Sequence, residues 1–195
     1  WTGMIEDAFT LILNIISNRF IGKYILNETE VRRKLTNYFP SDETVFTNSG
    51  RSAILLAIQG LSIAKGDEII ISSFNCPAVI DPIITSGATP VLIDCNTNCG
   101  INTTMFKKAI NKRTKAVILT NIYGRLDERD VIRKIIGTQK IAIINDLSQS
   151  LIVPGLNPSF FRHDEIYIFS FGPEKHIYCF GGGAIFSPKR HLIAK

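Results

Sequence analysis

The sequence has no run of apolar residues long enough to cross a lipid bilayer. Its N-terminal apolar stretch covers residues 9–16 and is interrupted by Asn14, whereas a transmembrane helix needs about 20 predominantly apolar residues. The first residues also lack a basic segment ahead of an apolar core, so we expect no signal peptide. These absences predict a protein without a membrane partner.

Long basic blocks are missing too. The net charge is +5, and the lysine and arginine residues are scattered in short clusters such as 32–34 and 107–108. This mild positive balance does not require a nucleic-acid partner, and we expect none. A preference for anionic small molecules fits the same charge.

Cysteine is scarce, and its spacing does not suggest a metal site. The four cysteines form no CxxC pair, and Cys95 and Cys99 have no histidines nearby at the spacing of zinc ligands. We therefore predict no metal site, and instead expect free, mostly buried thiols in a reducing cytoplasm. A dinucleotide-binding Rossmann domain is also disfavoured, because no G-x-G-x-x-G turn follows the first expected strand.

The chain does contain enough apolar sequence for a sizeable core. A hydrophobic content of 45% and a charged content of 20% are typical of a globular protein. A length of 195 residues fits one domain, or one domain and a fragment of another. Because the chain begins at Trp1 and stops at Lys195 just beyond an expected strand, we expect it to be a piece of something longer.

Strand-like and helix-like segments alternate from Val45 onward, whereas residues 1–44 predict a separate N-terminal helical segment. Strand runs with few polar residues, separated by helices, indicate a three-layer α/β/α domain over 45–195 with a mostly parallel sheet. The expected strands are 45–47, 68–72, 90–94, 116–120, 141–145, 166–171 and 184–186. The expected helices are 53–61, 77–86, 103–110 with Asn102 as its cap, and 127–136.

One lysine stands where a buried strand ends. The run 166–171 is rich in β-branched and aromatic residues, Gly172-Pro173 breaks it, and Lys175 follows in the loop. A lysine held against apolar walls loses hydration, which favours the neutral amine that a nucleophile requires. For a lysine alone, a surface position on a β-turn is the commoner explanation.

Other polar groups end the neighbouring strands, where ligands collect in open α/β sheets. Residues 48–52 form a turn that opens a helix, whose free amides and partial positive charge suit a phosphate. Asp146 follows the strand 141–145 and either pairs with a cationic ring nitrogen or caps a helix. An anion site, an acid and a lysine are the parts that pyridoxal phosphate needs.

Eight motifs together resemble those of a known family. With them the chain resembles, from about residue 45 to residue 186, the large domain of the DegT/DnrJ/EryC1/StrS aminotransferases. That family consists of fold-type I pyridoxal-phosphate enzymes that aminate keto groups on nucleotide-linked sugars. The motifs lie, in order, at 48–53, 65–70, 87–94, 113–118, 123–124, 144–149, 170–175 and 182–184.

The resemblance implies a role for each site residue. Lys175 would be the Schiff-base lysine and proton shuttle, Asp146 would contact the pyridine nitrogen, and Gln149 would lie near the phenolic oxygen of the ring. Ser170 would hold the phosphate together with the turn Gly50, Arg51 and Ser52. Either Phe74 or Cys76 would contact the ring face, because Cys76 stands where members of the family normally have a stacking aromatic residue.

The resemblance also implies the reaction and the partners. An amino donor, expected to be glutamate, would supply the amino group, and a keto-sugar nucleotide would accept it. Members are homodimers and carry a smaller C-terminal domain, which we expect these 195 residues not to encode. Arg51, Leu147, Ser148 and Gly181 depart from the usual residues and indicate a divergent subgroup. The alternatives are a non-catalytic regulatory or assembly partner and one half of a split enzyme.

Two further side chains have alternative interpretations. Tyr123 follows a strand end, and either lines the pocket or packs in the core. His176 adjoins Lys175 and either touches a ligand or makes a structural hydrogen bond.

Overall fold

The computed structural model of the chain describes residues 43–150, 160–175 and 181–187. Of the predicted helical segment 1–44, only residues 43 and 44 fall within this part, and they begin a strand. The remainder of that segment, together with His176 and Cys179, lies outside the described residues.

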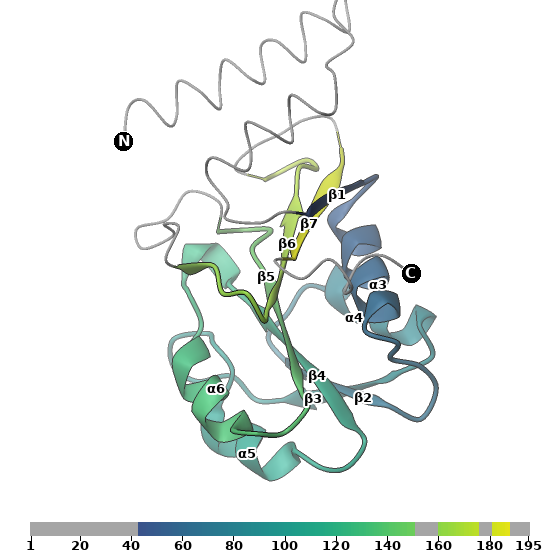
Figure 1. The fold of residues 1–195 in the computed structure, drawn as a ribbon. Coiled ribbons are helices and arrows are strands. Elements are labelled where there is room, and N and C mark those ends of the chain that lie inside the picture. The colour runs from purple at the N-terminus through teal and green to yellow at the C-terminus, as the bar shows by residue number, and fades with distance from the viewer. Residues whose placement is uncertain (1–42, 151–159, 176–180, 188–195) are drawn as a thin grey trace, which may run out of the picture. The chain divides into compact units, whose positions relative to one another are not determined.

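Strands and helices alternate from β1 to β5, as the sequence predicts, and the strands β6 and β7 follow (Figure 1). The predicted boundaries agree with the observed ones to within three residues, and Asn102 caps its helix by accepting a hydrogen bond from the amide of Met105 at 3.0 Å. The elements are β1 (Glu43–Thr47), α3 (Gly50–Gly60), β2 (Glu68–Ser72), α4 (Pro77–Thr85), β3 (Thr89–Ile93), α5 (Thr103–Ala109), β4 (Thr114–Thr120), the 3-10 helix η1 (Ile122–Gly124), α6 (Arg129–Ile136), β5 (Ala142–Asp146), β6 (Ile166–Ser170) and β7 (Gly183–Ser187).

The strands form one seven-stranded sheet in the order β1-β7-β6-β5-β4-β2-β3. Strands β3, β2, β4, β5 and β6 pair in parallel, while β7 runs antiparallel to both of its neighbours. The prediction of a mostly parallel sheet is therefore confirmed. The reversed strand β7 separates β1 from β6, an arrangement that the alternation of segments along the sequence does not predict.

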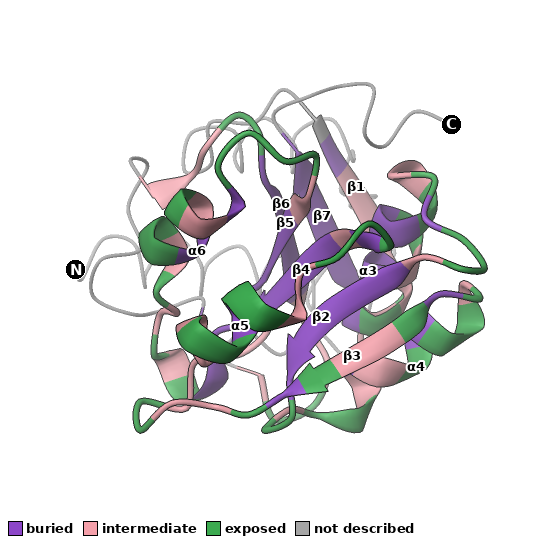
Figure 2. Ribbon diagram, turned by 90° about the horizontal axis from the view of Figure 1, so that it is seen from below, coloured by how far each residue is buried: buried purple, intermediate pink, exposed green. Residues whose placement is uncertain are grey.

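Apolar side chains cover both faces of this sheet. On one face, Ile69 and Ile71 of β2 pack with Ala57 of α3 and Ile83 of α4. On the other face, Ile70 of the same strand packs with helices α5 and α6. Successive residues of a strand point to opposite faces, so a continuous isoleucine run supplies both cores. Strand β2 is buried along its whole length, whereas β3 is partly exposed (Figure 2). The three-layer α/β/α prediction is confirmed.

A buried charge cluster fixes β5 and β6 to α6. The fully buried Glu165 accepts hydrogen bonds from Arg133 at 2.7 Å, Asn145 at 2.8 Å and the hydroxyl of Tyr167 at 3.1 Å. Burial and the Glu165 carboxylate raise the pKa of Tyr167, so its hydroxyl stays protonated and can donate. Asn145 immediately precedes Asp146, so the cluster also anchors the end of β5.

Glycines bring the start of β7 against the start of α3. The amide of Gly182 donates to the carbonyl of Asn48 at 3.0 Å, and the carbonyl of Gly182 accepts from Phe171 at 2.9 Å. A Cβ atom at Gly183 would lie only 2.6 Å from the carbonyl carbon of Ser49 and 2.7 Å from the amide nitrogen of Gly50. The absence of a side chain at 183 therefore permits the close approach of the start of α3 and the start of β7.

No helix within residues 43–150, 160–175 and 181–187 combines the length and apolarity that crossing a membrane requires.

Gly183→Ala should lower the free energy of unfolding by about 1–3 kcal/mol, because the backbone must shift to admit the added methyl group. Gly172→Ala is the matched control, since the nearest atom to its added Cβ would be the Ser170 hydroxyl oxygen at 3.8 Å. Urea unfolding of both variants measures the difference. Equal midpoints would contradict the close-approach explanation.

Candidate active site

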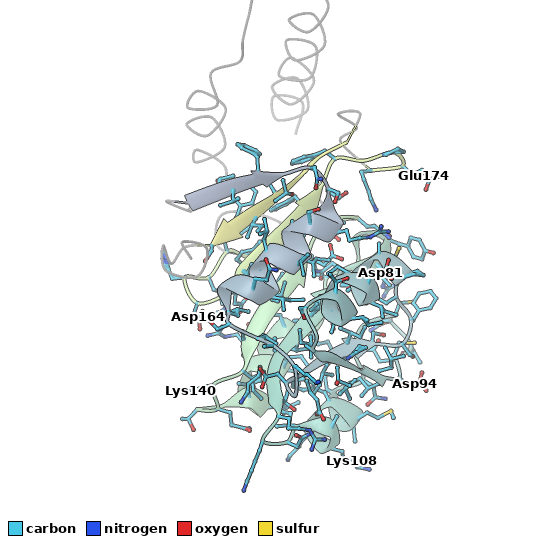
Figure 3. The ribbon with its side chains drawn as sticks, turned by 90° about the vertical axis from the view of Figure 1, so that its right-hand side faces the viewer. Asp81, Asp94, Lys108, Lys140, Asp164 and Glu174 are labelled. Carbon is cyan, nitrogen blue, oxygen red and sulfur yellow. The ribbon has the colours of Figure 1, made fainter. Side chains whose placement is uncertain are left out.

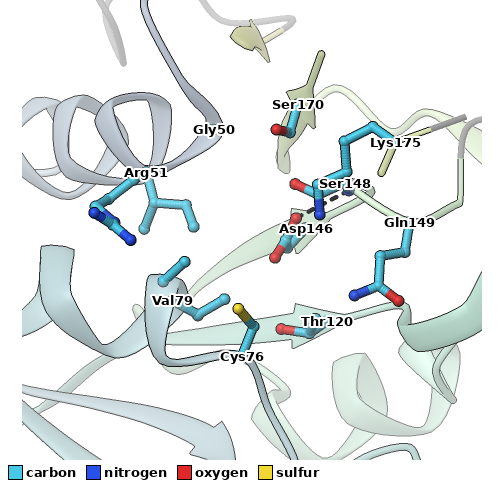
Figure 4. A pocket seen from close by; sticks show the side chains of 12 residues that line it. Gly50, Arg51, Cys76, Val79, Thr120, Asp146, Ser148, Gln149, Ser170 and Lys175 are labelled. Atoms are coloured by element: carbon cyan, nitrogen blue, oxygen red, sulfur yellow. Dashed lines mark hydrogen bonds between the residues drawn. The ribbon is translucent and has the colours of Figure 1, made fainter. Parts of the chain in front are cut away.

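A pocket lies at the carboxyl ends of the central parallel strands, where open α/β sheets bind ligands. Strands β4, β5 and β6 each contribute their last residue, and helices α3 and α4 contribute their first turns (Figure 4). The lining residues are Gly50, Arg51, Ile54, Cys76, Ala78, Val79, Thr120, Asp146, Ser148, Gln149, Ser170 and Lys175. Seven of the nine residues predicted for the site, Gly50, Arg51, Cys76, Asp146, Gln149, Ser170 and Lys175, are therefore brought together.

Asp146 is a buried carboxylic acid in this pocket. It ends β5, pairs in register with Thr120 of β4, and is only 3% exposed. One of its oxygens, Oδ1, accepts a hydrogen bond from the amide of Ser148 at 3.0 Å. Burial raises the pKa of Asp146, and the hydrogen bonds from Ser148 and the charge of Lys175 offset only part of that rise. A cationic group bound next to Asp146 would therefore stabilise its charged form.

Lys175 reaches the pocket from a tight turn after β6. The amide of Lys175 donates to the carbonyl of Gly172 at 3.3 Å, and Glu174 adopts the left-handed conformation with φ 66°. The side chain of Glu174 projects from the edge of the molecule (Figure 3). Lys175 is half-buried and its amine points toward Asp146 (Figure 4). The turn therefore directs a lysine at a buried acid.

The start of α3 forms a cradle for an anion. Ser49 caps the helix by accepting from the amide of Ser52 at 3.1 Å. The amides of Gly50 and Arg51, which come before it, have no acceptor within the helix. A Cβ atom at Gly50 would lie 3.2 Å from the hydroxyl oxygen of Ser170 and 3.4 Å from that of Ser148. Glycine at position 50 thus lets the first turn of α3 lie directly beside two hydroxyl groups, and these hydroxyls and the positive end of the helix can together hold an anion.

Arg51 lies beside this cradle on the first turn of α3. Its Nε is 3.6 Å from a carboxylate oxygen of Asp81 on α4, and both side chains are more than half exposed. An exposed pair of this length contributes little to stability. The guanidinium thus keeps donors for an anionic ligand.

Two residues predicted for the site do not line the pocket. The Ser52 hydroxyl lies 3.0 Å from that of Ser49 and belongs to the helix cap. Phe74 is 43% exposed, whereas Cys76 lines the pocket at the start of α4. Of the two residues predicted for contact with the ring, the structure brings only Cys76 into the pocket wall. The roles of all the site residues remain predictions.

Tyr123 matches neither of its two interpretations. Its side chain is 76% exposed, so it does not pack in the core, and it is not among the residues that line the pocket. Its amide instead donates to the Oε1 of Gln149 at 3.0 Å.

Sequence reasoning missed several polar residues of the site. Thr120 ends β4 inside the pocket, and its hydroxyl accepts a hydrogen bond from the Nδ2 of Asn75 at 2.9 Å. Ser148 binds Asp146 and faces Gly50. The position of Thr120 at the end of an apolar run could have identified it as a pocket residue. The contacts of Ser148 depend on the geometry of its turn, which sequence spacing alone does not specify.

The cysteines in the described part of the chain are free thiols. Cys76 is exposed, while Cys95 and Cys99 are half-buried, so the prediction of mostly buried thiols is wrong for these three. Within residues 43–150, 160–175 and 181–187, no three histidine, cysteine or acidic side chains gather as a metal site would require.

Comparison with known proteins gives relatives with sugar transaminase names. The chain is 31% identical over 168 residues to the dTDP-3-amino-3,4,6-trideoxy-alpha-D-glucose transaminase of Streptomyces venezuelae, a match that covers 84% of this chain and 44% of that protein. It is 29% identical over 170 residues to the UDP-2-acetamido-2-deoxy-3-oxo-D-glucuronate aminotransferase of Pseudomonas aeruginosa, covering 85% and 47%.

Solved structures agree on the fold. The crystal structure of NtdA from Bacillus subtilis with bound cofactor PMP superposes with a TM-score of 0.82 at 26% identity, covering 96% of this chain and 43% of that one. The chain thus spans about half the length of the curated relatives it matches. The model of the DegT/DnrJ/EryC1/StrS aminotransferase family matches residues 6–195. This chain belongs to that family, as its motifs predict.

Proposed function

We propose that this chain is the cofactor-binding domain of a pyridoxal-phosphate-dependent aminotransferase. The enzyme would transfer an amino group, with glutamate as donor, to a keto group of a nucleotide-linked sugar. The observation that supports this most strongly is the amine of Lys175 facing the buried acid Asp146 at the carboxyl ends of parallel strands. The sugar transaminase names of the relatives support the substrate class.

The residues of the pocket fit this cofactor. A carboxylate that is 3% exposed suits a cationic ring nitrogen, because a buried charge requires a charged or hydrogen-bonded partner. The free amides at the start of α3, beside the hydroxyl group of Ser170, suit a phosphate. Bound pyridoxal phosphate supplies an electron sink for the reacting carbon of the substrate.

Each pocket residue of this chain would have its own role in binding the cofactor or in proton transfer. Lys175 would hold the cofactor covalently through Nζ, and that amine would take and return the proton at the reacting carbon. Asp146 would keep the ring nitrogen cationic. Cys76 and Val79 would shape the wall of the pocket, and Gln149 would offer a polar contact at its rim.

Partners and location form part of the same proposal. A homodimer follows from what the family resemblance implies. A cytoplasmic location is supported by the free thiols of Cys76, Cys95 and Cys99, because disulfides form mainly in oxidising compartments. Sedimentation of the purified chain tests the dimer.

A non-catalytic regulatory or assembly partner is the alternative. The amine of Lys175, which points toward Asp146, favours the enzyme, since a non-catalytic partner would have no need for a buried acid near an amine. A chain that dimerises but leaves pyridoxal phosphate free in solution would favour the alternative.

Adding pyridoxal phosphate to the purified chain should produce a visible absorption band that depends on Lys175. Lys175→Ala should abolish the band, because no amine remains to bond the aldehyde. Lys108→Ala is the matched control, because Lys108 is an exposed lysine on α5 (Figure 3). A band of equal strength in the Lys175→Ala protein would overturn the assignment.

Asp146→Asn should weaken cofactor binding without lowering the stability of the cofactor-free chain at pH 7. Because the pKa of Asp146 is raised in the folded state, its carboxyl group contributes stability at low pH that is lost as the pH rises through that pKa. The variant should therefore unfold at the same or a higher urea concentration at pH 7, and its advantage should shrink toward pH 4. Its affinity for pyridoxal phosphate should fall about tenfold or more, because a charge-assisted hydrogen bond is lost.

Asp94→Asn is the control for that experiment, since Asp94 is exposed directly after β3 and its carboxylate accepts from the amide of Cys95 at 3.1 Å. The control should change neither property. A large loss of stability in Asp146→Asn at pH 7 would contradict the view that burial of this carboxylate destabilises the cofactor-free chain at that pH.

Gly50→Ala should weaken binding of pyridoxal phosphate and of inorganic phosphate alike. The added Cβ would lie 2.9 Å from that of Ser170, so Ser170 and the start of α3 would have to move apart, and the groups that hold the phosphate would be misplaced. Competition between inorganic phosphate and pyridoxal phosphate in the absorbance assay measures this. Unchanged binding of both would show that the phosphate sits elsewhere.

A further inference from the structure

The turn after β4 holds a bulky residue in an unfavourable backbone conformation. Tyr123 has φ 53° and ψ 29°, the left-handed region that aromatic residues rarely adopt. Its side chain is 76% exposed, so side-chain packing does not account for the conformation. Backbone strain of this kind persists only when the surroundings impose it, and it gathers at functional sites.

Hydrogen bonds between two turns impose the conformation. The turn after β4 and the turn after β5 are joined by the amide of Asn121, which donates to the carbonyl of Asp146 at 3.1 Å. The hydroxyl of Ser150 donates to the carbonyl of Asn121. The amide of Tyr123 completes the set by donating to Oε1 of Gln149 at 3.0 Å. The two turns are therefore one unit, built directly beside Asp146.

This unit settles which end of the Gln149 carboxamide faces the pocket. A backbone N–H can only donate, so the atom next to Tyr123 must be the carbonyl oxygen of the side chain. The amino group Nε2 then lies on the other side. Gln149 lines the pocket, and its nitrogen end is directed toward the other lining residues (Figure 4).

We propose that Tyr123 is a positioning residue whose backbone orients Gln149 so that Nε2 donates a hydrogen bond to a ligand oxygen in the pocket. The inference rests on the proposed function, because the acceptor is an anionic oxygen of pyridoxal phosphate. The role belongs to the conformation and amide of residue 123 and not to the tyrosine side chain.

Three variants separate the backbone from the side chain. Tyr123→Gly keeps the amide and adopts φ 53° without strain, so it should retain the affinity for pyridoxal phosphate and unfold at an equal or higher temperature. Tyr123→Val introduces a β-branched residue that disfavours this conformation, and should weaken binding about tenfold. Gln149→Glu still accepts from the amide of residue 123 but has no donor for the pocket, and should weaken binding at least as much.

The readouts are the dissociation constant of pyridoxal phosphate by absorbance titration, the pH midpoint of the absorbance change, and thermal unfolding of the cofactor-free chain. Loss of a donor to an ionised oxygen raises that midpoint, so it should rise in Tyr123→Val and Gln149→Glu but not in Tyr123→Gly. A double variant, Tyr123→Val with Gln149→Ala, should bind no more weakly than Gln149→Ala alone.

Different results would overturn different claims. If Gln149→Glu binds like the wild type, Nε2 does not donate to the ligand and the inference is wrong. If Tyr123→Gly loses affinity as Tyr123→Val does, the tyrosine side chain acts and the backbone role is wrong. Should Tyr123→Val fail to fold, these two variants still decide. Failure of the wild-type chain to bind pyridoxal phosphate would overturn the proposed function and this inference together.

Discussion

The carboxyl group of Asp146 sits at the end of a central strand with 3% of its surface exposed, and much of the surrounding structure relates to it. A buried carboxylate is unfavourable unless a positive or hydrogen-bonding partner reaches it. The amide of Ser148 supplies one such partner, and the amine of Lys175 points toward the same group. Behind the strand, the bond from Asn145 to Glu165 holds β5 in place. The groups of the site are thus arranged around the carboxylate of Asp146, which can bind a cationic group of a ligand.

The sheet brings the other groups to that charge through its reversed strand. Because β7 lies between β1 and β6, its glycine stretch at 181–183 lies against the start of α3, which in turn lies beside Ser170. The close approach at Gly183 places the anion cradle of Gly50 on the same side as Lys175. The fold and the site therefore depend on the same glycine, because a side chain at 183 would displace the start of α3, which lines the pocket.

Much of this could be predicted from the sequence. Apolar runs such as 68–72 and 166–171 indicate the strands, and the principle that ligands bind at strand ends predicts that Asp146, Ser170 and Lys175 lie together. Contacts between distant turns could not be predicted. The hydrogen bond from the amide of Tyr123 to Gln149 forms with Tyr123 in the left-handed backbone conformation, which a tyrosine rarely adopts. The position of β7 depends on pairing between strands far apart in the chain, which periodicity does not encode.

The central claim is that Lys175 is the residue that bonds the cofactor. The most direct measurement is peptide mass mapping of the chain after incubation with pyridoxal phosphate and reduction with borohydride, which makes the bond permanent. The account predicts a single modified peptide, the one that contains Lys175, at close to one label per chain. A label spread over the exposed lysines, or confined to a peptide without Lys175, would contradict it.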